Sequence, residues 1–248
     1  MAKREVIGRY RGSMLGLFWS LVNPVFMLSI YTVIFGSVFR MRWSQGSGHQ
    51  SEFIAILFTG LIIHGLFSEV ITRATRLIAG SPNLVTKVVF PLEILPAITI
   101  GAALFHTLVS MLILMAYNFI LTGQIPITVL LLPIVLLPFL ILLLGIALLL
   151  SSFGVYFRDL SQTAGMLSSA LLFLSPIFYP ITAIPENYQH YLFLNPLTFI
   201  IIEMRNILLW GNLPDWQGLL IYSIAALTFW FLGWAWFQKT RKGFADVL

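Results

Sequence analysis

Residues 127–150 read ITVLLLPIVLLPFLILLLGIALLL, and this stretch contains no charged side chain. A helix needs about 20 apolar residues to cross the roughly 30 Å hydrocarbon core of a bilayer, so the stretch predicts a transmembrane helix. The whole chain has the same character: of 248 residues, 59% are hydrophobic and 9% are charged, against about 25% charged residues in a soluble domain. This composition excludes a water-soluble globule and a disordered chain. The chain contains no cysteine, and this absence excludes a disulfide scaffold and thiol chemistry.

The other long apolar runs predict further spans. We expect an all-α polytopic membrane protein in which residues 1–248 form a single transmembrane domain. Its six expected transmembrane helices lie at residues 23–39, 53–72, 94–121, 127–150, 163–179 and 216–237. The fifth run follows the polar stretch around Arg158 and Asp159 and is short for a full crossing.

Residues 1–22 carry four basic side chains ahead of the first span: Lys3, Arg4, Arg9 and Arg11. Apolar residues recur there at spacings of three and four with the arginines between them, which is typical of a helix lying in the membrane interface. A signal peptide is excluded, because the apolar run that follows is far longer than an h-region of about 7 to 15 residues. Pro24 stands where the first spanning helix is expected to begin.

Two further segments predict helices that do not span. Residues 81–91 predict a short amphipathic helix opened by Ser81 or Pro82, which is too short and too polar to cross. Residues 180–210 are apolar but are cut by prolines, and each proline leaves a backbone carbonyl that needs another partner in hydrocarbon. We therefore expect two short re-entrant or interfacial helices, at about residues 186–194 and 196–209.

The basic residues indicate the orientation. Eleven of the fourteen fall on the same side of the expected membrane plane as the N-terminus, and the other three are Arg40, Arg42 and Arg205. By the positive-inside rule, both termini are expected in the cytoplasm. The net charge of +5 is thereby explained by position relative to the membrane, and no nucleic-acid partner is expected.

No sequence motif of a self-sufficient enzyme is present. The chain contains no GxxxxGK[ST], HExxH, CxxC or GxSxG motif, so an energy-consuming role needs a partner that binds the nucleotide. The four histidines form no i,i+3 or i,i+4 pair, and no metal site is expected. His64 and His106 fall inside expected spans, where an ionisable side chain is either functional or satisfied by hydrogen bonds. Glu69 precedes Arg73 by one helical turn, and a local structural pair is the favoured interpretation.

Tyr31, Phe35 and Phe39 form an i,i+4,i+8 stripe along the first expected span. Such a stripe usually reflects helix packing. The alternative is a row of rings along a sugar-conducting path, because aromatic faces with polar edges suit sugars that slide past them. Periodicity alone leaves both interpretations open.

Four segments in order along the chain resemble a known family. They are RYRGSMLGLFWSLVNPVFMLSIYTVIFG (9–36), SPNLVTKVVFPLEILP (81–96), YFRDL (156–160), and FLSPIFYPITAIPENYQHYLFLNPL (173–197) with the following IIEMRNILLWG (201–211). Together they resemble the permease subunit of ABC-2 type polysaccharide exporters. The resemblance implies a homodimer paired with two copies of a separate ABC ATPase, in contact with membrane lipids of the bacterial inner membrane. It also implies a lipid-linked polysaccharide as substrate, ATP and Mg bound by the partner ATPase, and no cofactor in this chain.

The resemblance also implies roles for particular residues. Those expected to couple to the ATPase are Pro82, Asn83, Leu84, Val85, Lys87, Val88, Arg158 and Asp159. Those expected at the entrance for the lipid diphosphate are Arg4, Arg9, Tyr10 and Arg11, and Tyr31, Phe35 and Phe39 are expected to line the channel. Those expected in the outer gate are Pro180, Pro185, Tyr188, Tyr191, Asn195, Pro196, Glu203 and Arg205.

Among substrates, the opening segment favours O antigen over capsule or teichoic acid. One alternative is an ABC-2 exporter of drugs or small molecules, which would share six spans but would favour an apolar pocket. Another is a membrane enzyme acting on a lipid-linked sugar, which would need convergent carboxylates. The glutamates that could supply them are spread along the chain: Glu52, Glu69, Glu93, Glu186 and Glu203.

Overall fold

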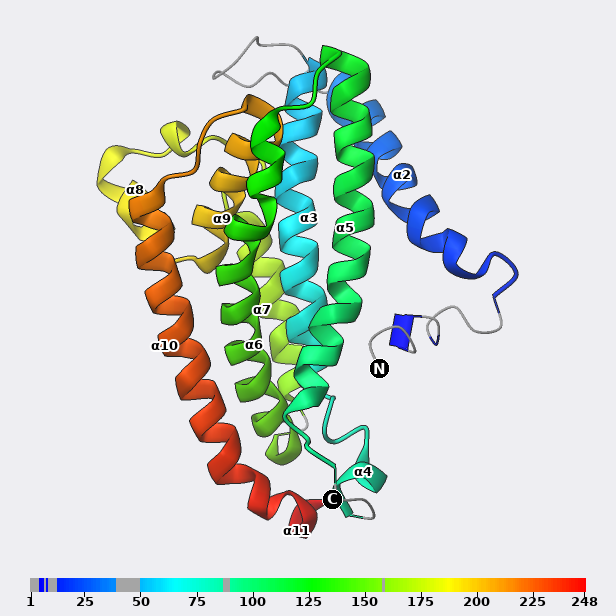
Figure 1. The fold of residues 1–248 in the computed structure, drawn as a ribbon, viewed down its shortest axis with the longest axis vertical. Coiled ribbons are helices and arrows are strands. Elements are labelled where there is room, and N and C mark those ends of the chain that lie inside the picture. The colour runs from blue at the N-terminus through cyan, green and yellow to red at the C-terminus, as the bar shows by residue number, and fades with distance from the viewer. Residues whose placement is uncertain (1–4, 7, 9–12, 39–49, 87–89, 158) are drawn as a thin grey trace.

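The computed structural model describes residues 5–6, 8, 13–38, 50–86, 90–157 and 159–248. Over these residues the chain is all-helical, without a strand, and forms an elongated bundle (Figure 1). The longer helices are α2 (Trp19–Tyr31), α3 (Gln50–Ala74), α5 (Ile94–Thr122), α6 (Leu132–Tyr156), α7 (Leu160–Leu174), α9 (Pro196–Arg205) and α10 (Trp216–Thr240). The shorter helical elements are η1 (Gly16–Phe18), η2 (Thr32–Val38), α4 (Pro82–Thr86), η3 (Ile127–Leu131), η4 (Ile181–Ala183), α8 (Glu186–Leu192), η5 (Asn206–Trp210), η6 (Arg241–Gly243) and α11 (Phe244–Val247).

Five helical stretches of the described chain are long and apolar enough to cross a membrane: Gly16–Phe35, Ser51–Ala74, Ile94–Thr122, Ile127–Tyr156 and Trp216–Val247. They confirm the polytopic all-α prediction. The first begins at Gly16, not at residue 23, and Pro24 lies inside α2. A proline inside a transmembrane helix is tolerated where neighbouring groups satisfy the freed carbonyl, so Pro24 does not mark a helix start.

The fifth expected span, 163–179, is instead the fifteen-residue helix α7. At 1.5 Å per residue it is about 22 Å long, less than the roughly 30 Å hydrocarbon core. It ends at Leu174 because Ser175 is extended and Pro176 follows. The two short helices expected next are present as α8 and the continuous stretch α9–η5, which meet at an angle of 97° and count as a sixth span only if taken together.

Helix α3 forms the core of the bundle. Of its most apolar window, 78% is buried, against 11% for the first span and 17% for the last. It packs against α2, α5, α6, α7 and α9, and α2 diverges from α5 toward its own N-terminal end (Figure 1). Because most of α3 is buried, most of its side chains face other helices, whereas most of α10 is exposed. Helix α3 is therefore the scaffold on which the candidate sites are built.

Glycines allow the helices around α3 to approach closely. Gly145 of α6 faces Gly233 of α10, and a Cβ added to Gly145 would lie 2.7 Å from the Cα of Trp230. A Cβ added to Gly154 of α6 would collide with the backbone carbonyl of Thr75 at the end of α3. Small residues at such contacts give close van der Waals packing, which replaces the hydrophobic driving force that is missing between helices in lipid.

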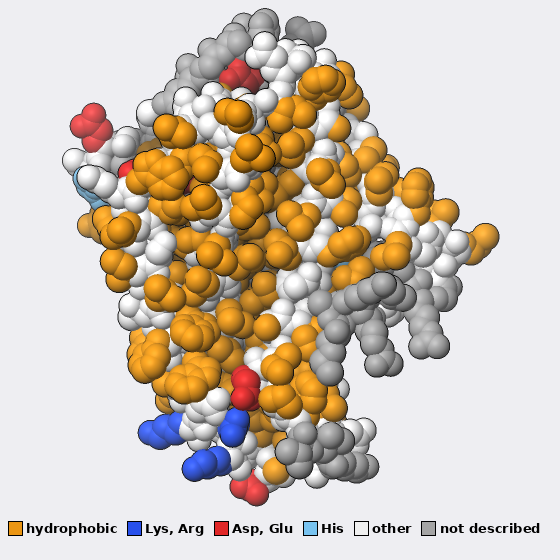
Figure 2. Space-filling view, in the orientation of Figure 1, with side chains coloured by type: hydrophobic (Ala, Val, Ile, Leu, Met, Phe, Trp, Pro, Cys, Tyr) orange, Lys and Arg blue, Asp and Glu red, His pale blue; other side chains and the backbone are white. Residues whose placement is uncertain are grey.

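The two ends of the bundle differ in charge. Figure 2 shows an apolar flank along the length of the molecule, with Lys and Arg side chains gathered near the C-terminus. We call this end the α4 end, since α4, α11 and the C-terminal end of α3 lie there, and the opposite end the α8 end. Exposed apolar side chains on α10, such as Leu220, Ile221 and Phe231, suit contact with lipid tails.

Candidate functional site

Arg205, expected in the outer gate, is buried inside the bundle with 3% of its surface exposed. Its Nε donates to the carbonyl of Ile56 on α3, and its Nη2 donates to the carbonyl of Ile177 in the segment after α7, each over 3.2 Å. Gly60 makes the room: a Cβ there would lie 3.2 Å from Nη2. Arg205 thus ties α9 and the residues after α7 to the central helix. It lies inside the bundle, although the sequence counted it among the three basic residues on the side away from the N-terminus.

Two more of the expected gate residues stabilise the same region. Glu203 is 3% exposed and accepts hydrogen bonds from the backbone N–H of Asp215 (3.0 Å) and the side-chain amide of Asn206 (3.2 Å). Asn195 caps α9 by accepting from the N–H of Leu197 (3.0 Å), and its amide donates to the hydroxyl of Ser175 (2.8 Å). These contacts hold the ends of α9–η5 to α7 and to the start of α10.

The remaining gate residues have different surroundings. Pro180 and Pro185 are the residues before η4 and α8, and Pro196 is the first residue of α9. Tyr188 and Tyr191 on α8 are exposed, at 63% and 67%. The structure therefore divides the predicted gate set into a buried group around α9 and an exposed tyrosine pair on α8.

Tyr31 and Phe35 of the predicted channel stripe pack against α3. The ring of Tyr31 lies 6.4 Å from that of Phe58, and the ring of Phe35 lies 6.0 Å from that of Phe53, with Tyr31 and Phe35 6.4 Å apart. Both side chains are half-buried. The stripe therefore continues onto α3 as an aromatic row, which the sequence did not predict because Phe53 and Phe58 belong to another helix.

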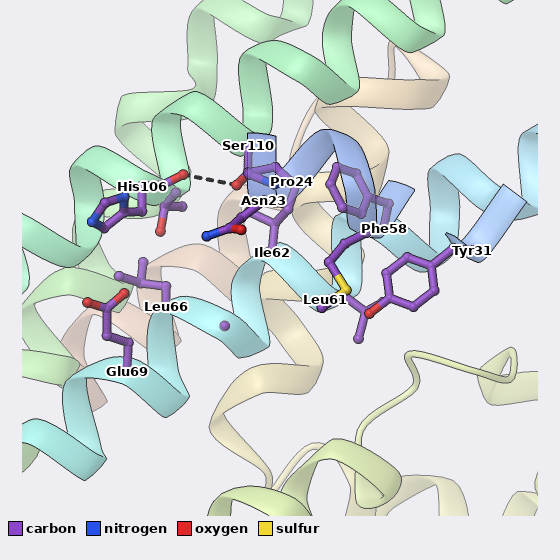
Figure 3. Close-up of a pocket in the computed structure, with 13 residues that line it drawn as sticks. Asn23, Pro24, Tyr31, Phe58, Leu61, Ile62, Leu66, Glu69, His106 and Ser110 are labelled. Atoms are coloured by element: carbon purple, nitrogen blue, oxygen red, sulfur yellow. Dashed lines mark hydrogen bonds between the residues drawn. The ribbon is translucent and has the colours of Figure 1, made fainter. Parts of the chain in front are cut away.

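A groove of about 270 Å³ begins beside this row, between α2, α3 and α5. Figure 3 shows Tyr31 and Phe58 toward one end of it and the polar side chains of Glu69, His106 and Asn23 farther along. The hydroxyl of Ser110 donates to the carbonyl of His106 (2.9 Å). The groove thus combines aromatic faces with a carboxylate, an imidazole and an amide, although Glu69, His106 and Asn23 come from three different helices.

His64 has a structural role. Its Nε2 lies 2.9 Å from the backbone carbonyl of Ser168 on α7, and because a carbonyl only accepts, this nitrogen carries the proton. The hydroxyl of Ser168 is 3.4 Å away. His64 therefore links α3 to α7 through a buried contact, which matches the second of the two interpretations open from sequence.

At the α4 end, the predicted coupling segment packs on the C-terminal end of the chain. Leu84 and Val85 of α4 lie against a small apolar cluster that includes Ile78, Phe237 and Phe244, while Pro82 and Asn83 are exposed. The ring of Phe244 lies 5.5 Å from that of Phe237, edge to face. The four-residue helix α11 thus packs against α4, a contact that no local sequence pattern could predict.

Other predicted residues at this end are only partly described. Asp159 is exposed, and its backbone carbonyl accepts from the N–H of Gln162 in the first turn of α7. The predicted residues that lie outside the described part of the chain are Arg4, Arg9, Tyr10, Arg11, Phe39, Lys87, Val88 and Arg158. Among the described residues, no group of three His, Cys, Asp or Glu side chains is placed to hold a metal ion.

Comparisons with known proteins agree with this architecture. Residues 1–209 match the sequence profile of the ABC-2 type transporter family. The chain is 29% identical to the "O-antigen export system permease protein RfbA" of Myxococcus xanthus, covering all of this chain and 94% of that protein. It is 26% identical to the protein of the same name from Klebsiella pneumoniae, covering all of this chain and 93% of the relative. It is 28% identical to the "Polysialic acid transport protein KpsM" of Escherichia coli, covering 96% and 91%.

Proposed function

The chain belongs to the ABC-2 type transporter family, and on that premise we propose that it is the permease of an exporter that moves a lipid-linked polysaccharide, with O antigen the favoured one, across the bacterial inner membrane. Family membership implies a partner ATPase, and the transmembrane subunit does not hydrolyse ATP itself. In this proposal two copies of the chain assemble with two copies of that ATPase, which binds ATP and Mg. The observation that carries the proposal is the match, over the whole chain, to relatives named as O-antigen export permeases.

The groove between α2, α3 and α5 supports a sugar as cargo. A polymer that must slide needs hydrogen-bonding groups and aromatic faces without tight binding at any one step. The ring of Tyr31 beside Phe58, followed by Asn23 and Glu69, offers this combination. A drug exporter would favour a wholly apolar pocket instead, so the polar side chains Asn23, Glu69 and His106 in this groove support the polysaccharide.

The α4 end supports contact with the ATPase. In this proposal it faces the cytoplasm, which agrees with the Lys and Arg side chains gathered there. Pro82 and Asn83 offer an exposed surface, and Leu84 and Val85 fix α4 to the Phe244 cluster. A displacement of α4 by the ATPase is then passed to α10 and to the turn after α3, because Phe237 and Ile78 belong to the same cluster.

The α8 end supports a gate. Pro180 and Pro185 directly precede the short helices η4 and α8. Tyr188 and Tyr191 are exposed on the surface of α8. Arg205, Glu203 and Asn195 hold the α9–η5 helix in place beneath them. In the proposed gate, α8 is the moving part and α9 its fixed support.

The test is transport by the reconstituted complex. The permease and its ATPase are co-purified, placed in proteoliposomes, and assayed for ATP-dependent movement of a lipid-linked glycan. We expect glycan movement, and a double variant Tyr31→Ala/Phe35→Ala that moves glycan more slowly, or leaks. The matched control is Phe231→Ala, which removes an exposed ring from α10. A complex that hydrolyses ATP but moves only small lipophiles would refute the polysaccharide substrate, and unchanged flux in the double variant would return the aromatic row to helix packing.

A further inference from the structure

A second cavity, of about 240 Å³, lies at the α8 end between the first turn of α3, the last turns of α5 and the end of η5. Its wall is mostly apolar, with a few polar side chains among the lining residues: Ser51, Glu52, Asn118 and Thr122. Small-molecule sites have this character, because apolar surface supplies contact area and a few polar groups fix the orientation of the ligand. Pockets for drug-sized molecules measure about 300–1,000 Å³, so this smaller cavity suits a ligand of one ring.

The side-chain amide of Asn118 is the feature that points to a ligand. Asn118 is 8% exposed and lines the cavity from α5, a helix long and apolar enough to cross a membrane. Its main-chain carbonyl accepts from the hydroxyl of Thr122 (2.9 Å), but its side-chain amide makes no hydrogen bond with a described residue. A buried amide without a partner costs free energy, and the polar groups of a ligand recover that cost.

Glu52 and Trp210 line the same cavity from α3 and η5. The indole Nε1 of Trp210 donates to Oε1 of the Glu52 carboxylate over 3.3 Å. A carboxylate has about four lone-pair sites, so this bond does not exhaust its capacity to accept. The indole N–H lies in the plane of the ring, which leaves the ring faces for apolar contact. The bond thus holds a hydrogen-bond acceptor and an aromatic ring together at one site.

The cavity continues the groove between α2, α3 and α5 along the same two helices. On α3, Ser51 and Ala55 of the cavity and Phe58 of the groove follow at spacings of four and three, so they share one helix face. On α5, Asn118 follows Thr107 of the groove by eleven residues, which is about three turns and again the same face. The rise from Ala55 to Phe58 is only about 4.5 Å. A chain that occupies the groove is therefore placed to reach the cavity.

We propose that this cavity binds one neutral sugar unit of the exported glycan, with Glu52 and Asn118 holding its hydroxyl groups and Trp210 covering its apolar face. Sugar hydroxyls both donate and accept, which matches a carboxylate that accepts and an amide that does both. An acidic sugar fits less well, because its carboxylate needs donors or a cation, and no Lys, Arg or His is among the described lining residues. The proposal rests on the proposed function, which supplies the glycan, and it adds the class of sugar.

Two substitutions separate this role from a purely structural one. Glu52→Gln keeps an oxygen that can accept from the indole of Trp210, so the link between α3 and η5 is retained. Asn118→Leu keeps the approximate size of the side chain and removes an amide that has no described partner. Both variants should keep the wild-type unfolding midpoint. A lower midpoint for Asn118→Leu would contradict the assignment of its amide to a ligand.

The experiment measures sugar binding by the permease alone. Permease labelled with fluorotryptophan is purified in nanodiscs and observed by fluorine NMR, and Trp210→Phe identifies the Trp210 signal among those of the seven tryptophans. We expect methyl α-mannopyranoside, a neutral sugar, to shift this signal saturably. Asn118→Leu and Glu52→Gln should each weaken the binding about fivefold, the size expected for one hydrogen bond. Glycerol and the methyl glycoside of N-acetylneuraminic acid, an acidic sugar, should leave the signal unchanged at the same concentration.

The matched control is Asn187→Leu, which removes an exposed amide from α8 outside this cavity and should bind like the wild type. Two results would overturn the site: a Trp210 signal that the mannoside does not move, or equal binding by Asn118→Leu. An equal response to the acidic glycoside would overturn the restriction to neutral sugars. None of these measurements needs ATP or transport. A complex that exports no glycan while the Trp210 signal still responds would therefore count against the proposed function and not against this site.

Discussion

Replacing Arg205 with lysine should loosen the α9–η5 helix without changing the buried charge. The guanidinium donates to carbonyls on two separate segments, Ile56 on α3 and Ile177 after α7. A lysine ammonium is a single nitrogen and cannot occupy the positions of Nε and Nη2 together, so at least one charge-assisted hydrogen bond is lost. Such a bond contributes about 1.5–3 kcal/mol. For a chain of this size, a loss of about 2 kcal/mol lowers the unfolding midpoint by about 4–8 °C.

The assay for Arg205→Lys combines thermal unfolding of the purified permease with hydrogen exchange. We expect faster exchange in residues 175–210 and unchanged exchange in α10, because the hydrogen bonds to Ile56 and Ile177 join α9 to α3 and to the residues after α7. The control is Thr198→Val on the same helix: the hydroxyl of Thr198 is buried and has no hydrogen-bond partner in the described structure, so its removal should be neutral or stabilising. A lysine variant with the wild-type midpoint and wild-type exchange would refute the clamp.

Three further substitutions probe other contacts. Gly154→Ala should prevent stable accumulation of the permease, because the new Cβ meets the backbone of Thr75 directly after α3. Gly165→Ala on α7 meets nothing within 4 Å and should be tolerated; membrane expression levels compare the two. Phe244→Ala should reduce the coupling of ATP hydrolysis to transport, because α4 loses the side chain that it packs against. Val247→Ala changes an exposed side chain of the same helix and should not reduce the coupling. The coupling is measured as ATPase activity with and without glycan. Asn195→Ala should cost about 1 kcal/mol through loss of the α9 cap, a decrease measurable as a lower unfolding midpoint.

The spans were predictable because hydrophobicity acts locally: a run long enough to cross a bilayer must be helical and buried in lipid or protein. Local sequence also predicts α8 and α9, since Pro185 directly precedes α8 and Pro196 is the first residue of α9. The local nature of these signals also explains why the predicted start of the first span and the predicted end of the fifth span were wrong. Pro24 gives the same local signal inside a helix as at its start, and the apolar run after Ser175 continues in composition although the helix has ended.

The candidate sites were less predictable because their partners come from distant segments. Arg205 was counted with the basic residues of the outer side, since nothing near it in sequence shows that its guanidinium donates to a carbonyl of α3. Backbone carbonyls carry no sequence signal. The glycine that makes room for the guanidinium, Gly60, is one of eighteen in the chain, and only the fold distinguishes it.

Helix α3 connects these separate findings. It carries the carbonyl that holds Arg205 toward the α8 end, Phe58 beside the groove, and Arg73 in its last turn at the α4 end. Because α3 is a single helix of 25 residues buried along most of its length, it moves as a rigid rod or it does not move. We therefore expect a force that the partner ATPase applies at the α4 end to reach the Arg205 contact through α3. Binding of the partner ATPase at the α4 end should then change hydrogen exchange in residues 175–210, and Arg205→Lys should abolish that change while leaving ATPase binding intact.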